Sequence, residues 1–199
     1  WLCADLGRPL EVICHGSDVR LFARLPRPLR LSIARRLLGA RLELVDVGQR
    51  AQLHAALPTP LAEALLRRHR VAPSPLPPLE PGQAPSGLPP VYAAVVGRLL
   101  PGKRVALAVA ACRRAGLDCV VVGDGPVRLP AQPGLHPLGR RSHPETLAII
   151  AGARVLLHTS AEEGAPTVVR EARALDVPVV ACPSGDLSSR AARDPGIAL

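Results

Sequence analysis

Residues 158–180 read HTSAEEGAPTVVREARALDVPVV, and this pattern predicts a strand end, a loop, a helix, a turn and a second strand. Pro166 suits the first position of the helix, where its missing N–H costs no hydrogen bond. Ala165 would then be the N-cap, although alanine is a poor capping residue. We therefore expect the N–H groups of the first turn to be open to an anionic ligand.

Two carboxylates in this stretch lie eight positions apart, Glu163 in the loop and Glu171 inside the helix. Glu171 lies beside an apolar stripe at helical spacing, which consists of Val168, Val169, Ala172 and Leu175. An unpaired charge next to a buried face is costly. We therefore predict that a ligand is the partner of Glu171.

The C-terminal half alternates between predicted strands and predicted helices. Strands are expected at 91–96, 118–122, 134–139, 154–158 and 178–182, and helices at 103–116, 143–152 and about 185–193, before a last short strand. Strands of continuous Val, Leu and Ala that alternate with helices predict an α/β fold whose parallel sheet is covered on both faces. Ligands of such sheets bind at the carboxyl ends of the strands.

The N-terminal part predicts a strand at 9–14, a basic amphipathic helix at 26–41 and a strand at 42–47. Two short helical patterns then continue to His69, before a proline-rich stretch that cannot form regular structure. These patterns divide the chain into an N-terminal domain, an interdomain linker and a C-terminal domain, at residues 1–72, 73–90 and 91–199. The helix at 26–41 is either an ordinary surface helix or a contact with an anionic membrane surface.

Composition excludes several classes of protein. Hydrophobic residues make up 48% of the 199 residues, which indicates a folded chain. No apolar run is long enough to span a membrane, and nothing at the N-terminus resembles a signal peptide. The net charge is +9, but aromatics at 2% offer few platforms for stacked bases, so no nucleic acid is expected as a partner. The missing initial Met and the abrupt ends suggest a fragment truncated at both ends or an incomplete gene model.

The cysteines indicate reduced core residues. Their number is odd and none forms a C-x-x-C pair; they are Cys3, Cys14, Cys112, Cys119 and Cys182. This pattern predicts neither a disulfide framework nor a zinc site, and we expect no metal.

Two further motifs follow predicted strands. GRLLPGK, residues 97–103, brings Arg98 and Lys103 to a strand end, where two cations can grip a diphosphate. The alternative is a loop with solvated charges, but Lys103 is the single lysine of the chain, which favours a need for a compact ammonium group. GDGP, residues 123–126, is either a tight turn or part of a nucleotide-binding motif.

Together these motifs resemble a known family. GRLLPGK, VVGDGP and EEGAPTVVREARALDVPVV, in this order and spacing, resemble the C-terminal domain of glycosyltransferase family 4. HGSDV, residues 26–41 and LELVDV resemble the end of the family's acceptor-binding domain. The resemblance implies the GT-B fold, which has two Rossmann-like domains, with the N-terminal domain incomplete here.

The resemblance also implies a function. Family members are retaining enzymes that transfer a sugar from a nucleotide-diphosphate sugar to an acceptor hydroxyl, and generally need no metal. We therefore expect a hexosyltransferase-type enzyme without a cofactor, which acts on a carbohydrate or lipid-linked acceptor in the cytoplasm or at the cytoplasmic face of the membrane.

The resemblance implies roles for particular residues. Arg98 and Lys103 would hold the donor's diphosphate, and Glu171 would bind the ribose hydroxyls. Backbone N–H groups of Gly164 and Ala165 would add to the diphosphate site.

Two catalytic residues are implied in the same way. Glu163 would contact the transferred sugar, and His15 would approach this sugar from the N-terminal domain. A histidine at a strand end is otherwise often a hydrogen-bonded turn residue.

Departures from the family pattern keep an alternative open. The family's N-terminal glycine-rich loop has no counterpart, and Asp176 stands where the family usually has Gly. The alternative is a non-catalytic nucleotide-sugar-binding remnant or interaction domain. An NAD-dependent oxidoreductase is disfavoured, because it requires a complete glycine fingerprint after the first strand.

Overall fold

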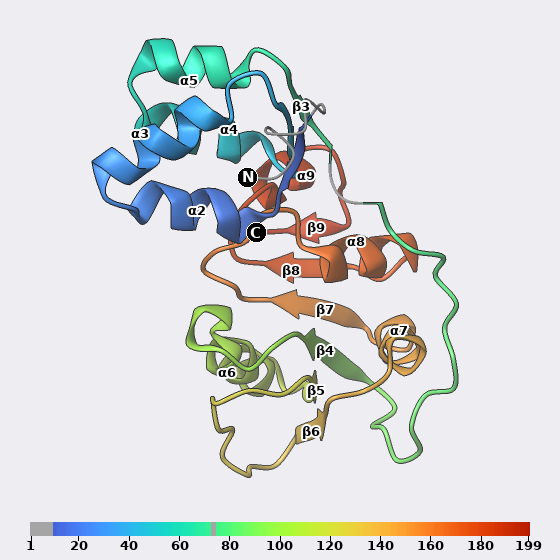
Figure 1. Ribbon diagram of the computed structural model, residues 1–199. Coiled ribbons are helices and arrows are strands. Elements are labelled where there is room, and N and C mark those ends of the chain that lie inside the picture. Colours follow the sequence, from blue (N-terminus) through green and yellow to red (C-terminus); the bar gives the residue numbers. More distant parts are fainter. Residues whose placement is uncertain (1–9, 73–74) are drawn as a thin grey trace. The chain divides into compact units, whose positions relative to one another are not determined.

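The computed structural model describes residues 10–72 and 75–199 (Figure 1). The chain forms two compact units. The first extends to Pro75 and includes Glu163–Ala165, whereas the second comprises Leu76–Glu162 and Pro166–Leu199. Cys3, the start of the strand predicted at 9–14 and the first two residues of the predicted linker lie outside the described residues.

The first unit contains a three-stranded parallel sheet in the order β1-β2-β3. The strands are β1 (Glu11–Cys14), β2 (Arg41–Leu44) and β3 (His69–Val71), and the helices are α2 (Gly16–Arg24), α3 (Arg27–Arg36), α4 (Val47–Ala56) and α5 (Thr59–Leu66). Leucines of β2, α4 and α5 form the core of this unit, together with Val19 and Ala34.

The helix predicted at 26–41 is shorter than expected, and the strand predicted at 42–47 is shifted. α3 ends at Arg36, and Gly39 adopts a left-handed φ of 90°, so the chain turns and β2 begins at Arg41. The strand ends at Leu44 because Asp46 caps α4, where its carboxylate accepts a hydrogen bond from the N–H of Gln49. β3 was missed, because three residues are too few to reveal a strand period in the sequence.

The second unit contains a six-stranded parallel sheet in the order β6-β5-β4-β7-β8-β9. The strands are β4 (Tyr92–Val96), β5 (Asp118–Val122), β6 (Leu135–Gly139), β7 (Val155–His158), β8 (Val179–Ala181) and β9 (Ile197–Ala198). The helical elements are η1 (Pro101–Lys103), α6 (Val105–Ala115), α7 (His143–Ala151), α8 (Thr167–Ala174) and α9 (Leu187–Ala191). The predicted alternation of strands and helices is confirmed, with shifts of one or two residues at most ends.

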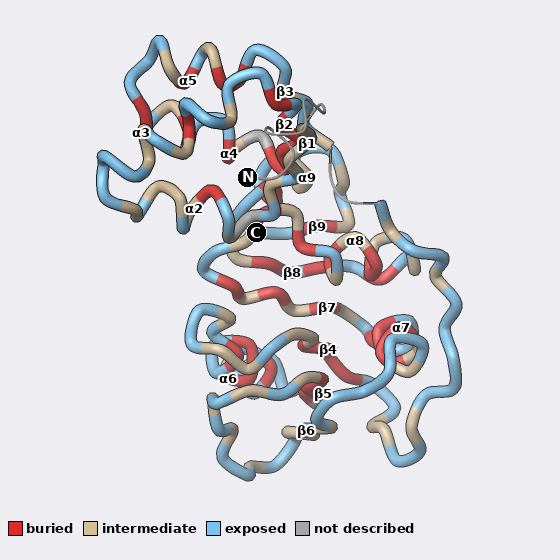
Figure 2. The backbone as a smooth tube through the Cα atoms, viewed as in Figure 1, coloured by how far each residue is buried: buried red, intermediate tan, exposed pale blue. Residues whose placement is uncertain are grey.

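Both faces of this sheet are covered, as the continuous apolar strands predict. Tyr92 and Ala94 of β4 belong to a core with residues of α7, α8 and α9. Their neighbours Ala93 and Val95 belong to a second core with residues of α6. Buried residues therefore follow one another without a gap along β4 and β5 (Figure 2). This arrangement confirms the α/β fold class.

The proline-rich segment has no helix or strand between residues 75 and 90. It is not detached from the second unit, because the N–H of Gly82 donates to the carbonyl oxygen of Pro144 on α7 (2.9 Å).

α8 begins one residue later than predicted. Pro166 is the N-cap, with an extended ψ of 116°, and Thr167 is the first helical residue. The prediction of Ala165 as the N-cap is therefore wrong, because a proline also fits the extended backbone just before a helix. The expected weakness of the cap remains, since no side chain caps this terminus.

The GDGP motif lets two loops approach closely. The N–H of Leu99 donates to the carbonyl oxygen of Asp124 (2.8 Å), and the N–H of Gly97 donates to that of Val122 (3.0 Å). Gly123 has a φ of 138°, and a Cβ at this position would overlap the carbonyl oxygen of Gly97. The glycines of the motif therefore let the GRLLPGK loop lie against the backbone that follows β5.

We predict that Gly123→Ala destabilises the protein by about 2 kcal/mol or more, because the added methyl group meets fixed backbone at a disfavoured φ. Gly102→Ala is the matched control, since a Cβ there meets no atom within 4 Å. Urea unfolding of both variants provides the measurement. Equal stability of the two variants would contradict the close approach.

Candidate functional site

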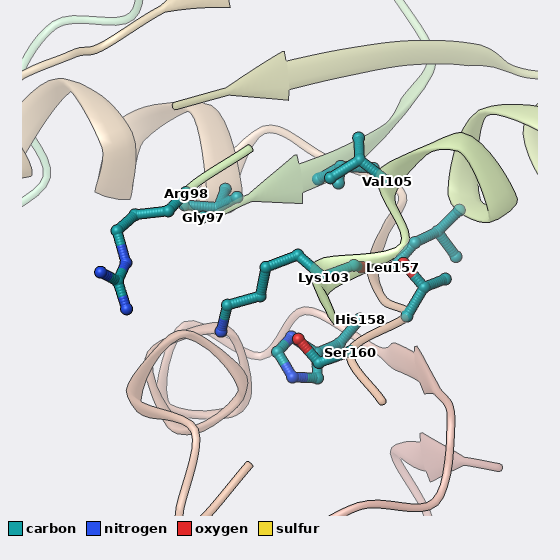
Figure 3. Close-up of a pocket in the computed structure, with 10 residues that line it drawn as sticks. Gly97, Arg98, Lys103, Val105, Leu157, His158 and Ser160 are labelled. Carbon is teal, nitrogen blue, oxygen red and sulfur yellow. Dashed lines mark hydrogen bonds between the residues drawn. The ribbon is translucent and has the colours of Figure 1, made fainter. Parts of the chain in front are cut away.

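A small pocket lies at the carboxyl edge of the second unit's sheet, where β4 and β7 end side by side (Figure 3). It is lined by residues 95–98, by Lys103 and Val105, and by residues 157–160. Its volume is about 10 Å³, which is room for about one water molecule. A larger ligand must therefore bind over the mouth of the pocket.

The structure brings Arg98 and Lys103 to this same pocket, as the GRLLPGK motif predicts. Arg98 is exposed, Lys103 is half-buried, and both side chains extend toward the same side of the pocket (Figure 3). Two cations at a strand edge raise the local positive potential, so the arrangement suits an anion with two charged groups.

Hydrogen bonds lock the loop that carries Lys103. Thr159 donates from its hydroxyl to the carbonyl oxygens of Lys103 (3.0 Å) and Arg104 (3.1 Å). In the other direction, the guanidinium of Arg104 donates to the carbonyl oxygens of Thr159 (2.7 Å) and Ser160 (3.2 Å). The N–H of Ala161 also donates to the carbonyl oxygen of Gly102 (2.9 Å). We call these five hydrogen bonds together the loop clamp.

Arg104 was missed by the sequence reasoning. It adopts a left-handed φ of 49°, which is uncommon for a residue with a side chain. No sequence signal marks it, because an arginine beside Lys103 is unremarkable in a chain so rich in arginine.

Two of the buried residues that line the pocket are polar. His158 is 5% exposed and Ser160 is 1% exposed, and both follow from the end of β7. The sequence pattern predicts a strand end here and indicates no role for either residue. Their position after a strand was the signal that could have found them.

Glu171 has a partner in the protein, so the premise that its carboxylate lacks one is wrong, whereas a ligand on Glu171 stays a prediction. This carboxylate is 7% exposed, and its Oε1 lies 2.9 Å from Nε2 of His143. The missed partner is the first residue of α7, 28 positions away in the sequence. Spacing along one helix cannot reveal such a contact.

A capping box fixes the helix start that carries His143. The carboxylate of Glu145 accepts hydrogen bonds from the N–H (3.0 Å) and the hydroxyl (2.6 Å) of Ser142. These hydrogen bonds hold the pKa of the Glu145 carboxyl below its usual value. The ring of His143 therefore starts from a well-defined backbone.

Four of the predicted site residues belong to the first unit. His15 is exposed and is the N-cap of α2, where its N–H donates to Oδ2 of Asp18 (2.8 Å). Glu163 and Ala165 are half-buried and Gly164 is buried. Within this unit, Arg20 donates from Nη1 to the carbonyl oxygen of Glu163 (3.0 Å).

No group of three or more His, Cys, Asp or Glu side chains within residues 10–72 and 75–199 could hold a metal ion. No described helix is both long and apolar enough to cross a membrane.

Residues 90–196, more than half of the chain, match the family described as glycosyl transferases group 1. The chain belongs to this family. The match covers five strands of the six-stranded sheet, β4 to β8, together with the pocket of Arg98 and Lys103 and the Glu171–His143 pair. A comparison with curated proteins gives no match.

Solved structures show the same fold as this group 1 chain. The crystal structure of Anabaena Alr3699/HepE in complex with UDP and glucose has a TM-score of 0.68 at 18% identity, over 94% of this chain and 56% of that one. An apo structure of OtsA has a TM-score of 0.66 at 15% identity, over 94% of this chain and 56% of that one. The structure of WaaG, a glycosyltransferase involved in lipopolysaccharide biosynthesis, has a TM-score of 0.52 at 16% identity. The similarity covers 85% of this chain and 54% of that one. The chain thus spans about half the length of these proteins, and the likeness shows the α/β fold of GT-B glycosyltransferases.

We predict that His143→Ala lowers the free energy of unfolding by about 1–2 kcal/mol, because it leaves the carboxylate of Glu171 without its ring partner. The matched control is His136→Ala, which removes a ring at the same 2.9 Å from Asp118. The Asp118 side chain is 38% exposed, against 9% for Glu171, so water can replace the lost partner.

The control His136→Ala should therefore lower the free energy of unfolding by less than about 1 kcal/mol. Thermal unfolding of both variants provides the measurement. If His136→Ala costs as much as His143→Ala, burial of Glu171 does not determine the strength of the pair.

Proposed function

We propose that this chain is part of a retaining glycosyltransferase that uses a nucleotide-diphosphate sugar as its donor. The observation that carries the proposal is the pairing of Arg98 and Lys103 at one pocket, on the sheet edge where parallel α/β folds bind ligands. Membership of the group 1 family supports the same reaction class. The crystal structure of the similar Alr3699/HepE, in complex with UDP and glucose, suggests which probes to test.

The two cations would act on the leaving group. Breaking the bond between the sugar C1 and the phosphate oxygen moves negative charge onto the diphosphate. Arg98 and Lys103 stabilise this charge, and the loop clamp keeps Lys103 in place before the reaction begins. We assign Gly164 and Ala165 as backbone N–H donors to the same group.

Glu171 would bind the ribose. A carboxylate has two oxygens and about four acceptor sites. Because His143 engages Oε1, Oε2 remains the oxygen best suited to accept hydrogen bonds from the ribose hydroxyls. In this role His143 fixes the orientation of the carboxylate.

The transfer step forms a bond between the acceptor oxygen and C1 on the face that the phosphate leaves. The acceptor hydroxyl passes its proton to the departing phosphate oxygen, so charge and atoms balance. Glu163 and His15 are our candidates for the residues that contact the transferred sugar, on which positive charge develops. No metal or other cofactor is required, since the two cations neutralise the leaving group.

Residues 1–72 would carry the acceptor side of the enzyme and residues 91–199 the donor side, joined by the linker at 73–90. The acceptor would be a carbohydrate or a lipid-linked sugar, and the reaction would take place in the cytoplasm.

A surface of α3 supports a contact with an anionic membrane. Arg27, Arg35 and Arg36 are exposed on this helix, and Leu29 is 47% exposed. The paired change Arg35→Glu and Arg36→Glu should abolish flotation of the chain with vesicles rich in acidic lipid. Equal flotation with neutral and acidic vesicles would contradict this contact.

The alternative is a protein that binds nucleotide sugars without transferring them. It predicts the same donor site but no turnover of the donor. A donor-hydrolysis and transfer assay on the protein separates the two functions.

We predict that the chain binds UDP, GDP or ADP, and that Lys103→Ala weakens this binding about tenfold or more, because a charged hydrogen bond is lost. Glu171→Ala should weaken the binding of nucleoside diphosphates but leave the binding of pyrophosphate unaffected, since pyrophosphate has no ribose. Arg114→Ala, which removes an exposed charge on α6, is the control. Calorimetry provides the measurement. A wild-type chain that binds none of the three nucleotides, or variants that bind as well as wild type, would overturn the donor site.

A further inference from the structure

Ser160 has a buried hydroxyl that its surroundings do not satisfy. The residue is 1% exposed, and its Oγ has no hydrogen-bond partner in the described part of the chain. Buried hydroxyl groups are normally hydrogen-bonded, because loss of water without a new partner is costly. Such an orphaned group calls for an explanation.

The backbone of Ser160 cannot easily rotate to find a partner. Its carbonyl oxygen accepts a hydrogen bond from Arg104, and the flanking Thr159 and Ala161 are held by the loop clamp. Arg104 itself adopts the disfavoured left-handed φ of 49° while it makes these contacts. The fold thus contains two unfavourable features at this point, the left-handed backbone of Arg104 and the unpaired hydroxyl of Ser160. Both are kept together with the position of this hydroxyl.

That position is the wall of the pocket that Arg98 and Lys103 share (Figure 3). The pocket volume of about 10 Å³ is close to the space that one water molecule requires. A phosphate oxygen has a similar size. One such oxygen can therefore enter the pocket while the rest of the group stays at the mouth.

We propose that the Ser160 hydroxyl donates a hydrogen bond to a phosphate oxygen of the ligand that Arg98 and Lys103 bind. The inference rests on the proposed function and adds a neutral, buried donor to two flexible cations. A hydroxyl at a fixed position selects an oxygen of defined geometry, whereas long cationic side chains tolerate several.

The assignment predicts opposite effects of one substitution. Ser160→Ala removes an unsatisfied buried group from the ligand-free protein, so the midpoint of thermal unfolding should rise by about 2 °C or more. The same substitution removes a charge-assisted hydrogen bond from the complex, so the affinity should fall about tenfold. A purely structural role of Ser160 would not move the affinity.

Ser184 provides a matched control. Its Oγ is also buried without a partner in the described residues, but Ser184 does not line the pocket. Ser184→Ala should raise the thermal midpoint in the same way and leave the affinity unchanged.

The test measures binding of inorganic pyrophosphate and of UDP to the 199-residue chain by calorimetry, for wild type, Ser160→Ala, Ser184→Ala and Lys103→Ala. The proposal expects weaker binding of both probes in Ser160→Ala and Lys103→Ala only. If Lys103→Ala weakens binding and Ser160→Ala does not, the donor site stands and the role of Ser160 is refuted, because a water molecule then satisfies its hydroxyl. If Ser184→Ala weakens binding as much as Ser160→Ala, the effect is not specific to the pocket and the role is also refuted. If wild type binds neither probe, the proposed function fails, and the role of Ser160 with it.

Discussion

The loop clamp between residues 101–104 and 159–161 is the contact on which the rest of the site depends. β4 and β7 are neighbours in the sheet, but pairing of strands fixes only the strands and not the loops that follow them. The hydroxyl of Thr159 and the guanidinium of Arg104 exchange hydrogen bonds with the opposite backbone and so turn two loops into one rigid edge. Lys103 lies inside this edge. Its backbone is therefore positioned by these contacts, which sets the region that its flexible side chain can reach.

The accessible cations and the buried polar groups of the proposed site have different roles. Arg98 is exposed and Lys103 is half-buried, so an incoming anion can meet both, whereas Ser160 and Glu171 are buried. Accessible cations attract a ligand over a distance, and buried groups discriminate between ligands because a poor fit leaves them unsatisfied. The contact between His143 and Glu171 belongs to the second kind, since it fixes a carboxylate that would otherwise be costly to bury.

The sequence predicted this fold well where the signal is continuous and local. The buried runs of β4 and β5 and the single lysine of the chain pointed to the sheet and to its carboxyl edge. Three features could not be predicted, because they depend on contacts between distant segments: the partner of Glu171, the left-handed Arg104 and the orphaned hydroxyl of Ser160. The missed strand β3 has a different cause, because it is only three residues long and is held by pairing with β2.

The central claim is that the carboxyl edge of β4 and β7 binds the diphosphate of a nucleotide. A crystal structure of the chain soaked with UDP tests this claim most directly. The account predicts a diphosphate within hydrogen-bonding distance of Lys103 Nζ and the Arg98 guanidinium, with one phosphate oxygen in the pocket beside Ser160. UDP bound at another surface, or a pocket that stays empty at saturating UDP, would contradict it.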